Sequence, residues 1–278
     1  MKSAIQDTKE LKSIARQLRR DVINSLATAG SGHLGASLGL ADIFAVLYFS
    51  HLNHQPQNPR WSQRDRLVLS IGHVAPILYA SLANAGYFHR DELATLRKLG
   101  SRLQGHPGLD TQLPGLETSS GSLGQGLSIA VGMALTAKYD KKKWQVYSIH
   151  GDGELQEGAI WEAAMSASHY KLDNLTAIVD RNRVQIDGPT HRVMSLEPLP
   201  DKFQAFGWHV LECNGNSIKD LLDVLHKARE YTGKPTVILA HTKMGAGVAQ
   251  IEDDYSWHGK APDAKQRIAF LKALDNAN

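Results

Sequence analysis

Short apolar runs alternate with longer amphipathic stretches along most of the chain. Five runs bounded by turn residues occupy residues 67–71, 145–149, 175–179, 209–212 and 236–240. Helical spacing of apolar residues marks the segments 74–85, 123–138, 159–171 and 218–231. The same spacing opens the chain, where apolar side chains recur at Leu11, Ile14, Ala15, Leu18, Val22 and Ile23. Strands that are apolar on both faces and alternate with helices predict an α/β fold, with a parallel sheet flanked by helices on both faces.

Composition is consistent with one globular unit. The chain has 278 residues, of which 42% are hydrophobic and 21% charged, the values of an ordinary folded protein. No internal repeat or linker interrupts the pattern, so residues 1–278 are expected to form a single domain. A net charge of +3 is too small to indicate a nucleic-acid partner.

The hydrophobic pattern indicates neither a membrane nor an export route. The longest apolar stretch, residues 38–49, is interrupted by Asp42, and the N-terminal segment lacks the apolar centre of a secretory signal. The single cysteine, Cys213, excludes a disulfide within the chain and is compatible with a reducing compartment. We therefore expect a cytoplasmic protein with no membrane partner.

Polar segments follow the predicted strands at one edge of the sheet. Gly72-His73 follows the first strand, Gly151-Asp152-Gly153 the second, and Asn182 comes soon after the third. In an open parallel sheet, ligands bind beyond the carboxyl ends of the strands. The site is therefore expected at this edge.

Asp152 and Asn182 have the chemistry of a hard metal site. They lie 30 residues apart, the length of one strand–helix–strand unit, so neighbouring parallel strands bring both side chains to the same edge. A carboxylate and an amide oxygen suit magnesium or calcium better than zinc. The helix expected after Gly153 offers free N–H groups to an anion, which indicates a metal-bound diphosphate. By itself, GDG would more often be a helix cap beside a turn; the second ligand at this spacing favours the metal site.

Seven short motifs narrow the family. In chain order they are SGHLG at 31–35, RDRLVLS with GH at 64–73, GHP at 105–107, LPG at 113–115, GSLGQG at 121–126, GDGELQEG at 151–158 and WHG at 257–259. GDG followed by Asn182 resembles the thiamine diphosphate-binding motif, and the whole set resembles transketolases in order and content. The match covers nearly all of the chain but only the amino-terminal half of a transketolase. It implies the thiamine diphosphate-binding fold, with residues 1–278 as the pyrophosphate-binding domain.

The resemblance also implies roles for individual residues. Mg²⁺, with Ca²⁺ or Mn²⁺ as substitutes, is expected on the Asp152 and Asn182 side chains and the backbone carbonyl of Val184. Contacts to thiamine diphosphate are expected from His73, Gly121, Leu123, Gly151, Asp152, Gly153 and Asn182. Catalytic roles are expected for His33, His106, His258 and Glu157, with the glutamate linking two active sites. Any one of these histidines, taken alone, would more often be structural, so the resemblance carries their assignment.

Four positions depart from the family pattern. Leu34 and Ser122 stand where proline is usual, which leaves both loops less rigid. Arg181 and Arg183 flank Asn182 where an acidic residue and a lysine are more typical, and they add positive charge beside the expected metal. These changes put the identity of the sugar substrate in doubt.

The matched half implies a divided enzyme. In transketolases a separate pyrimidine-binding domain carries the glutamate that activates the cofactor, so a C-terminal partner subunit is expected, in an α2β2 assembly. The reaction implied is transfer of a two-carbon ketol group from a ketose phosphate to an aldose phosphate. Two alternatives stay open: a subunit like 1-deoxyxylulose-5-phosphate synthase or the 2-oxoacid dehydrogenase E1 component, and a non-catalytic thiamine diphosphate-binding module.

Overall fold

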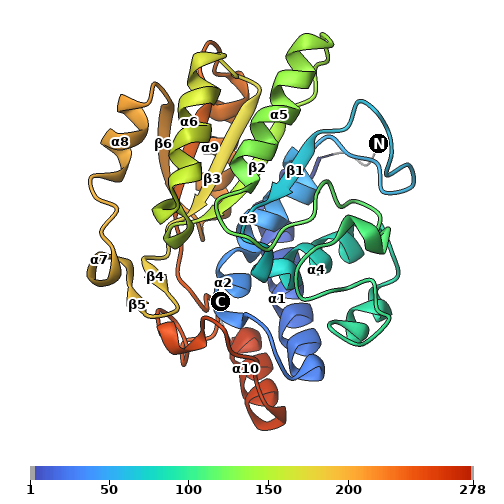
Figure 1. The fold of residues 1–278 in the computed structure, drawn as a ribbon. Helices are drawn as coiled ribbons and strands as arrows, with labels where there is room; N and C mark the ends of the chain where they lie inside the picture. The colour runs from blue at the N-terminus through green and yellow to red at the C-terminus, as the bar shows by residue number, and fades with distance from the viewer. Residues whose placement is uncertain (1–3, 277–278) are drawn as a thin grey trace.

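A five-stranded parallel sheet forms the centre of the molecule (Figure 1). The structure, a computed structural model, describes residues 4–276. Across the sheet the strands run in the order β1 (Arg66–Leu69), β2 (Val146–Gly151), β3 (Leu175–Asp180), β7 (Thr236–His241) and β6 (His209–Asn214). All neighbouring strands are parallel. The five expected strands are confirmed, with ends that shift by no more than two residues.

Helices cover both faces of this sheet, as predicted. One face packs against α1 (Thr8–Ala29), α3 (Ala41–Val46), α4 (Ala75–Ala85) and α9 (Ile218–Glu230). The other packs against α5 (Gly126–Tyr139), α6 (Gly158–His169) and α8 (Leu199–Ala205). Alternation along the strands divides the core: Ile149 and Ile178 face the first layer, and Ala177 and Val179 face the second.

The N-terminal helix α1 is shaped by its sequence pattern. The apolar residues spaced at three and four, among them Leu11, Leu18 and Val22, are fully buried in the first layer. The Asp7 side chain accepts a hydrogen bond from the Lys9 N–H at its start, and Gly30 ends it at φ +69°.

Further elements, which were not expected from the hydrophobic pattern, complete the fold. They are α2 (Leu34–Gly39), η1 (Leu47–His51), η2 (Gly72–Val74), η3 (Arg90–Thr95), η4 (Leu109–Thr111), η5 (Gly153–Gln156), β4 (Val184–Gln185), β5 (Gly188–Pro189), α7 (Thr190–Val193), η6 (Tyr255–Trp257) and α10 (Ala264–Asn276). Four of them follow a sheet strand: η2 comes after β1, η5 after β2, and the two strands of the β4–β5 hairpin after β3. Within residues 4–276, no helix has the length and apolar character needed to cross a bilayer.

Two glycines bring the first strand, the loop before α5 and α5 itself into close contact. A Cβ added to Gly126 would lie 2.4 Å from the Ser70 Cβ, and one added to Gly72 would lie 2.8 Å from the backbone carbon of Ser120. Neither position has room for a side chain. The loop 121–126 is therefore held directly against the carboxyl end of β1.

Candidate active site

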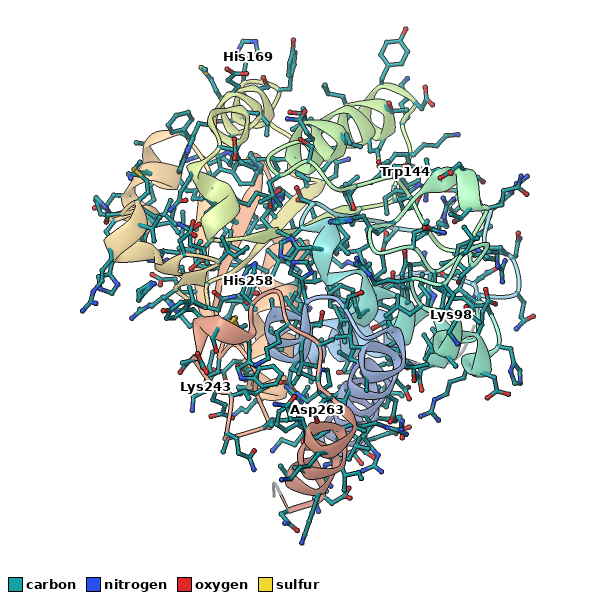
Figure 2. All side chains as sticks on the ribbon, turned by 60° about the horizontal axis from the view of Figure 1, so that its bottom comes forward. Lys98, Trp144, His169, Lys243, His258 and Asp263 are labelled. Atoms are coloured by element: carbon teal, nitrogen blue, oxygen red, sulfur yellow. The ribbon has the colours of Figure 1, made fainter. Side chains whose placement is uncertain are left out.

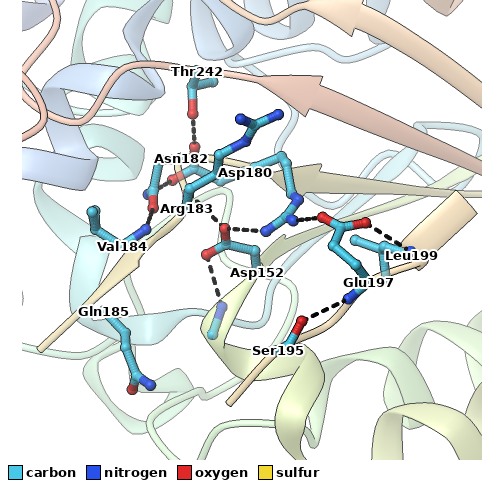
Figure 3. Close-up of polar contacts among 12 residues, drawn as sticks. Asp152, Asp180, Asn182, Arg183, Val184, Gln185, Ser195, Glu197, Leu199 and Thr242 are labelled. Carbon is cyan, nitrogen blue, oxygen red and sulfur yellow. Dashed lines mark hydrogen bonds and ion pairs between the residues drawn. The ribbon is translucent and has the colours of Figure 1, made fainter. Parts of the chain in front are cut away.

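Asp152 lies at the carboxyl end of β2, where the chain turns into η5. It is 1% exposed, and Figure 3 shows its carboxylate inside a ring of donors. One oxygen accepts the Gly153 N–H at 2.8 Å; the other accepts the Arg183 N–H at 2.6 Å and the Arg181 guanidinium at 3.0 Å. Burial raises the pKa of Asp152, and the Arg181 charge together with these hydrogen bonds opposes that rise.

The glycines around Asp152 permit close packing of the turn. A Cβ added to Gly151 would lie 3.1 Å from the Ile71 Cγ2, and one added to Gly153 would lie 3.2 Å from the Gln185 Cβ. Only a nearly bare backbone can pass between these neighbours without displacing them.

Asn182 lies two residues beyond the end of the neighbouring strand β3. Its side-chain amide donates to Asp180 at 2.9 Å, and its oxygen accepts the Val184 N–H at 3.0 Å (Figure 3). The Thr242 hydroxyl donates to the other Asp180 oxygen. Burial raises the pKa of Asp180 to about 7; the nearby Asp152 charge adds to the rise, and the Thr242 and Asn182 hydrogen bonds oppose it.

These groups fit a hard divalent cation. Asp152 and Asn182 are both buried, and the Arg183 N–H that binds Asp152 belongs to the turn that carries Asn182. The Asp152 oxygen bound to Gly153 and the Asn182 amide oxygen each accept one hydrogen bond within the described chain, so each retains a lone pair for a metal. Carboxylate, amide and carbonyl oxygens are the ligand types that Mg²⁺ and Ca²⁺ prefer. Asp152, Asn182 and the Val184 carbonyl would hold the ion.

Arg181 forms a buried ion-pair bridge at this edge that the sequence did not predict. Its guanidinium is 6% exposed and bridges Asp152 to Glu197, which lies just before α8. Through this bridge a segment distant in sequence is tied to the expected metal site. The positive charge that Arg181 adds is thus paired with two carboxylates.

The four motif histidines come from separate segments. The rings of His33, His73 and His258 are in mutual contact, with centroids 4.8, 5.7 and 5.3 Å apart. His106 lies beside the loop before α5, since a Cβ on Gly121 would be 3.8 Å from its ring. Figure 2 shows His258 near the middle of the molecule in that view.

Burial keeps these histidines neutral. Burial, followed by the charges of neighbouring histidines, lowers the pKa of His33 to about 4 and that of His73 to about 3. The pKa values of His106 and His258 are also lowered, chiefly by burial. A neutral imidazole has one N–H donor and one acceptor nitrogen. The Nδ1 atoms of His33 and His258 and the Ser120 hydroxyl are buried without a hydrogen-bond partner in the described chain. A polar ligand in this site would satisfy them.

A pocket of about 350 Å³ opens beside the loop that precedes α5. It is lined by Ser70, Ser119, Ser120, Gly121, Ser122, Gln125, Gly126 and Ile129. Gly121 is exposed and Leu123 is half-buried. Glu157 is exposed at the start of α6, and a Cβ on Gly124 would lie 2.8 Å from the Glu157 Cβ. The loop that carries Gly121 and Leu123, both expected to contact thiamine diphosphate, therefore lies beside the glutamate expected to link two active sites.

Sequence reasoning missed several polar residues of the site. Glu154 is 2% exposed and hydrogen-bonds to Ser70 and to the loop 121–126. Its spacing of four residues from His150, which directly precedes the GDGELQEG motif, was the available signal, since the two side chains pair at 3.1 Å. Arg181 was noted beside Asn182, but nothing local indicated its burial or its pairing with Glu197. Nothing local indicated the burial of Asp180 either.

Comparison with known proteins places the chain in a family. The sequence matches the family described as transketolase, thiamine diphosphate binding domain, over residues 9–274. An apulose-4-phosphate transketolase subunit from Phocaeicola vulgatus is 42% identical over 260 residues, covering 94% of this chain and 91% of that protein. The 6-deoxy-6-sulfo-D-fructose transketolase subunit SqwG from Clostridium sp. is 43% identical, covering 90% of each.

Longer transketolases match over one part of their length. Human transketolase is 44% identical over 92% of this chain but only 40% of its own. The crystal structure of Campylobacter jejuni transketolase superposes with a TM-score of 0.88 at 34% identity, covering 97% of this chain and 47% of that one. The chain thus spans less than half the length of these two relatives.

These matches confirm three predictions from the sequence: the α/β fold with its parallel sheet, the resemblance to the N-terminal half of transketolases, and an enzyme of transketolase type. The chain belongs to the transketolase family, carries its thiamine diphosphate-binding domain, and corresponds along its length to relatives that are named as transketolase subunits.

Proposed function

We propose that this chain holds the diphosphate and metal of thiamine diphosphate in a divided transketolase. With a C-terminal partner subunit it transfers a two-carbon ketol group from a ketose phosphate to an aldose phosphate. The observation that carries the proposal is the presence of two kinds of group beyond the carboxyl ends of neighbouring strands, where His73 follows β1 and Asp152 follows β2. Hard oxygen ligands lie at Asp152 and Asn182, and neutral histidines gather from separate segments.

The metal is proposed to be Mg²⁺, with Ca²⁺ and Mn²⁺ as substitutes. Asp152, Asn182 and the Val184 carbonyl supply three oxygens, which leaves room for waters and ligand phosphates, the coordination that Mg²⁺ favours. The Gly151 and Gly153 backbones allow the diphosphate close to the metal. No cluster of three His, Cys, Asp or Glu side chains suited to a metal occurs in the described part of the chain, and the proposed site needs none.

Thiamine diphosphate, when bound, supplies a carbon nucleophile and an electron sink for the two-carbon unit. The chain's own groups would orient the reactants and move protons. His33 and His258 each have a buried Nδ1 free to meet a hydroxyl or phosphate oxygen. Their lowered pKa values keep both rings neutral at pH 7, so either can donate or accept a proton. His106, beside Gly121, would meet the sugar.

The partner is proposed to be a transketolase C-terminal subunit with the pyrimidine-binding domain and the activating glutamate, in an α2β2 assembly. Support comes from relatives of similar length that are named as subunits of a transketolase. The exposed Glu157 beside Gly124 would link paired active sites. The names of two relatives specify an apulose phosphate and a sulfofructose, so the sugar is proposed to lie outside the usual pentose phosphates. We place the complex in the cytoplasm, where the single half-buried Cys213 stays reduced.

The test is ketol transfer by the purified chain, alone and combined with the complementary subunit, with Mg²⁺ and thiamine diphosphate present. A panel of phosphorylated ketose donors and aldose acceptors is assayed for product by mass spectrometry. We expect activity only with both subunits. Robust transfer by the single chain would refute the divided enzyme, and no transfer by the complex with any donor would refute the proposed reaction.

A further inference from the structure

Glu154 is a buried carboxylate surrounded by donors from three separate segments. Its Oε1 accepts a hydrogen bond from the Ser70 hydroxyl, at the end of β1, and another from the Gly124 N–H at 2.8 Å. Its Oε2 accepts the Gly151 N–H at 3.3 Å and faces the His150 Nδ1 at 3.1 Å. Burying a carboxylate to 2% exposure carries a large desolvation cost, so this side chain requires its partners.

Ser70 extends these contacts to the start of α5. Its hydroxyl oxygen accepts a hydrogen bond from the Gly126 N–H at 3.1 Å, and the same hydroxyl donates a hydrogen bond to Glu154. Two backbone amides of the loop 121–126 are therefore fixed, one directly and one through Ser70. His150 is fixed in turn, because its Nε2 lies 2.9 Å from the Ser148 hydroxyl.

The same carboxylate thus connects the two parts of the proposed cofactor site. One oxygen holds the loop that carries Gly121 and lines the pocket of about 350 Å³. The other holds the Gly151 N–H, next to the metal-binding Asp152. Charge-assisted hydrogen bonds to a buried carboxylate are short and directional, so they limit relative movement of the segments they join.

We propose that Glu154 is a positioning residue, which holds the loop 121–126 and the Gly151-Asp152-Gly153 turn in the one relative arrangement that thiamine diphosphate requires. This inference rests on the proposed function. The hydrogen bonds of Glu154 within the described chain go to Ser70, Gly124, Gly151 and His150, so its proposed role is exerted through these neighbours and not on the sugar itself.

Two substitutions separate hydrogen bonding from charge. Glu154→Ala removes all four contacts. Glu154→Gln can retain most of them, because its carbonyl can accept from Ser70 and Gly124 while its amide donates to His150 Nδ1 in the tautomer that carries the proton on Nε2. Only the long bond from Gly151 is lost. Ser70→Ala is a second route to the same loop, since it releases the Gly126 N–H without removing the carboxylate.

Asp42→Ala is the matched control. Asp42 is also a buried carboxylate, and it accepts hydrogen bonds from Arg19 and Asn216 in the helical layer of α3. Both partners lie outside the loop 121–126 and the turn that carries Asp152. Its loss reports the general effect of deleting a buried acid.

The first readout is hydrogen–deuterium exchange of the full chain without cofactor, in peptides covering residues 121–126. We expect exchange in Glu154→Ala to be about tenfold faster or more, the equivalent of losing one charged hydrogen bond. Ser70→Ala should show a smaller increase confined to this loop, and Glu154→Gln and Asp42→Ala should resemble the wild type. Unchanged exchange in both Glu154→Ala and Ser70→Ala would overturn the proposal.

The second readout is calorimetric titration of thiamine diphosphate, with MgCl₂ present, into the chain assembled with its complementary subunit. We expect Glu154→Ala to bind about tenfold more weakly or worse, and Glu154→Gln to bind nearly as the wild type. Faster exchange with unchanged affinity would overturn the positioning role. If the wild-type complex did not bind thiamine diphosphate, the proposed function would fail and this role with it, whereas the exchange data would still report whether Glu154 fixes the loop.

Discussion

His51 should make the protein measurably less stable in mild acid. Its Nε2 lies 2.8 Å from the Tyr147 hydroxyl, and burial, followed by the charges of Arg229 and His226, lowers its pKa from 6.5 to about 3. Since the folded pKa is below the unfolded one, the unfolded chain binds the proton more readily. Stability is therefore complete above pH 6.5 and falls as the pH drops below it. At pH 5, which is 1.5 below 6.5, the loss from this residue is about 2 kcal/mol, at about 1.4 kcal/mol for each pH unit.

The assay compares urea unfolding at pH 7 and pH 5 for the wild type and for His51→Gln. Glutamine offers the Tyr147 hydroxyl a hydrogen-bond partner but does not titrate. Other buried histidines make both proteins lose stability in acid, so the difference between the two losses isolates His51. We expect the free energy of unfolding of the wild type to fall by about 2 kcal/mol more than that of the variant.

His169→Gln provides the control, because His169 is exposed at the end of α6 (Figure 2). It reports the general effect of replacing an exposed histidine with glutamine. The same acid-induced loss in His51→Gln and the wild type would refute the reasoning, because it would mean that His51 is protonated as easily in the folded chain as in the unfolded one.

Three further outcomes are expected. Asp152→Ala should abolish magnesium-dependent binding of thiamine diphosphate by the assembled enzyme without altering its circular dichroism; unchanged affinity in calorimetry would contradict the metal role. His106→Ala should lower kcat for the ketose donor while the cofactor affinity changes by less than about twofold; an equal loss of cofactor binding would show that His106 is misplaced. Gly126→Ala should lower the free energy of unfolding by about 1–3 kcal/mol, because its Cβ would lie 2.4 Å from the Ser70 Cβ; urea denaturation at wild-type stability would contradict the close approach.

The sheet and its principal helices were predictable because their signals are local. The run at 175–179 is apolar on both faces and becomes the buried strand β3, Leu175–Asp180. The stretch at 218–231 has apolar residues on one stripe and becomes α9, capped by the Ser217 side chain. The edge that carries Asp152 and Asn182 followed from strand direction alone.

The polar interior of the site was not predictable, because it depends on contacts distant in sequence. The sequence places Arg181 beside the expected metal, but it does not show that Glu197, from the segment before α8, pairs with it. Nor does the sequence show that Glu154 is buried, because its burial depends on the Gly124 N–H, which the loop before α5 supplies. Buried charges of this kind are stabilised by partners that periodicity does not reveal.

The order of strands in the sheet has a consequence for folding during synthesis. β7 (Thr236–His241) is the last sheet strand to be synthesised in residues 4–276, yet it lies between β3 and β6 and is the only sheet strand there that β6 pairs with. The contact of the N-terminal helix α1 with α10 forms later still, because α10 is synthesised after β7. An ion pair of 2.6 Å between Arg20 and Asp275 joins these two helices. On the ribosome, β3 therefore presents an open edge until residue 241 has emerged. An open strand edge can pair with other chains, so the arrival of β7 closes this edge against such pairing.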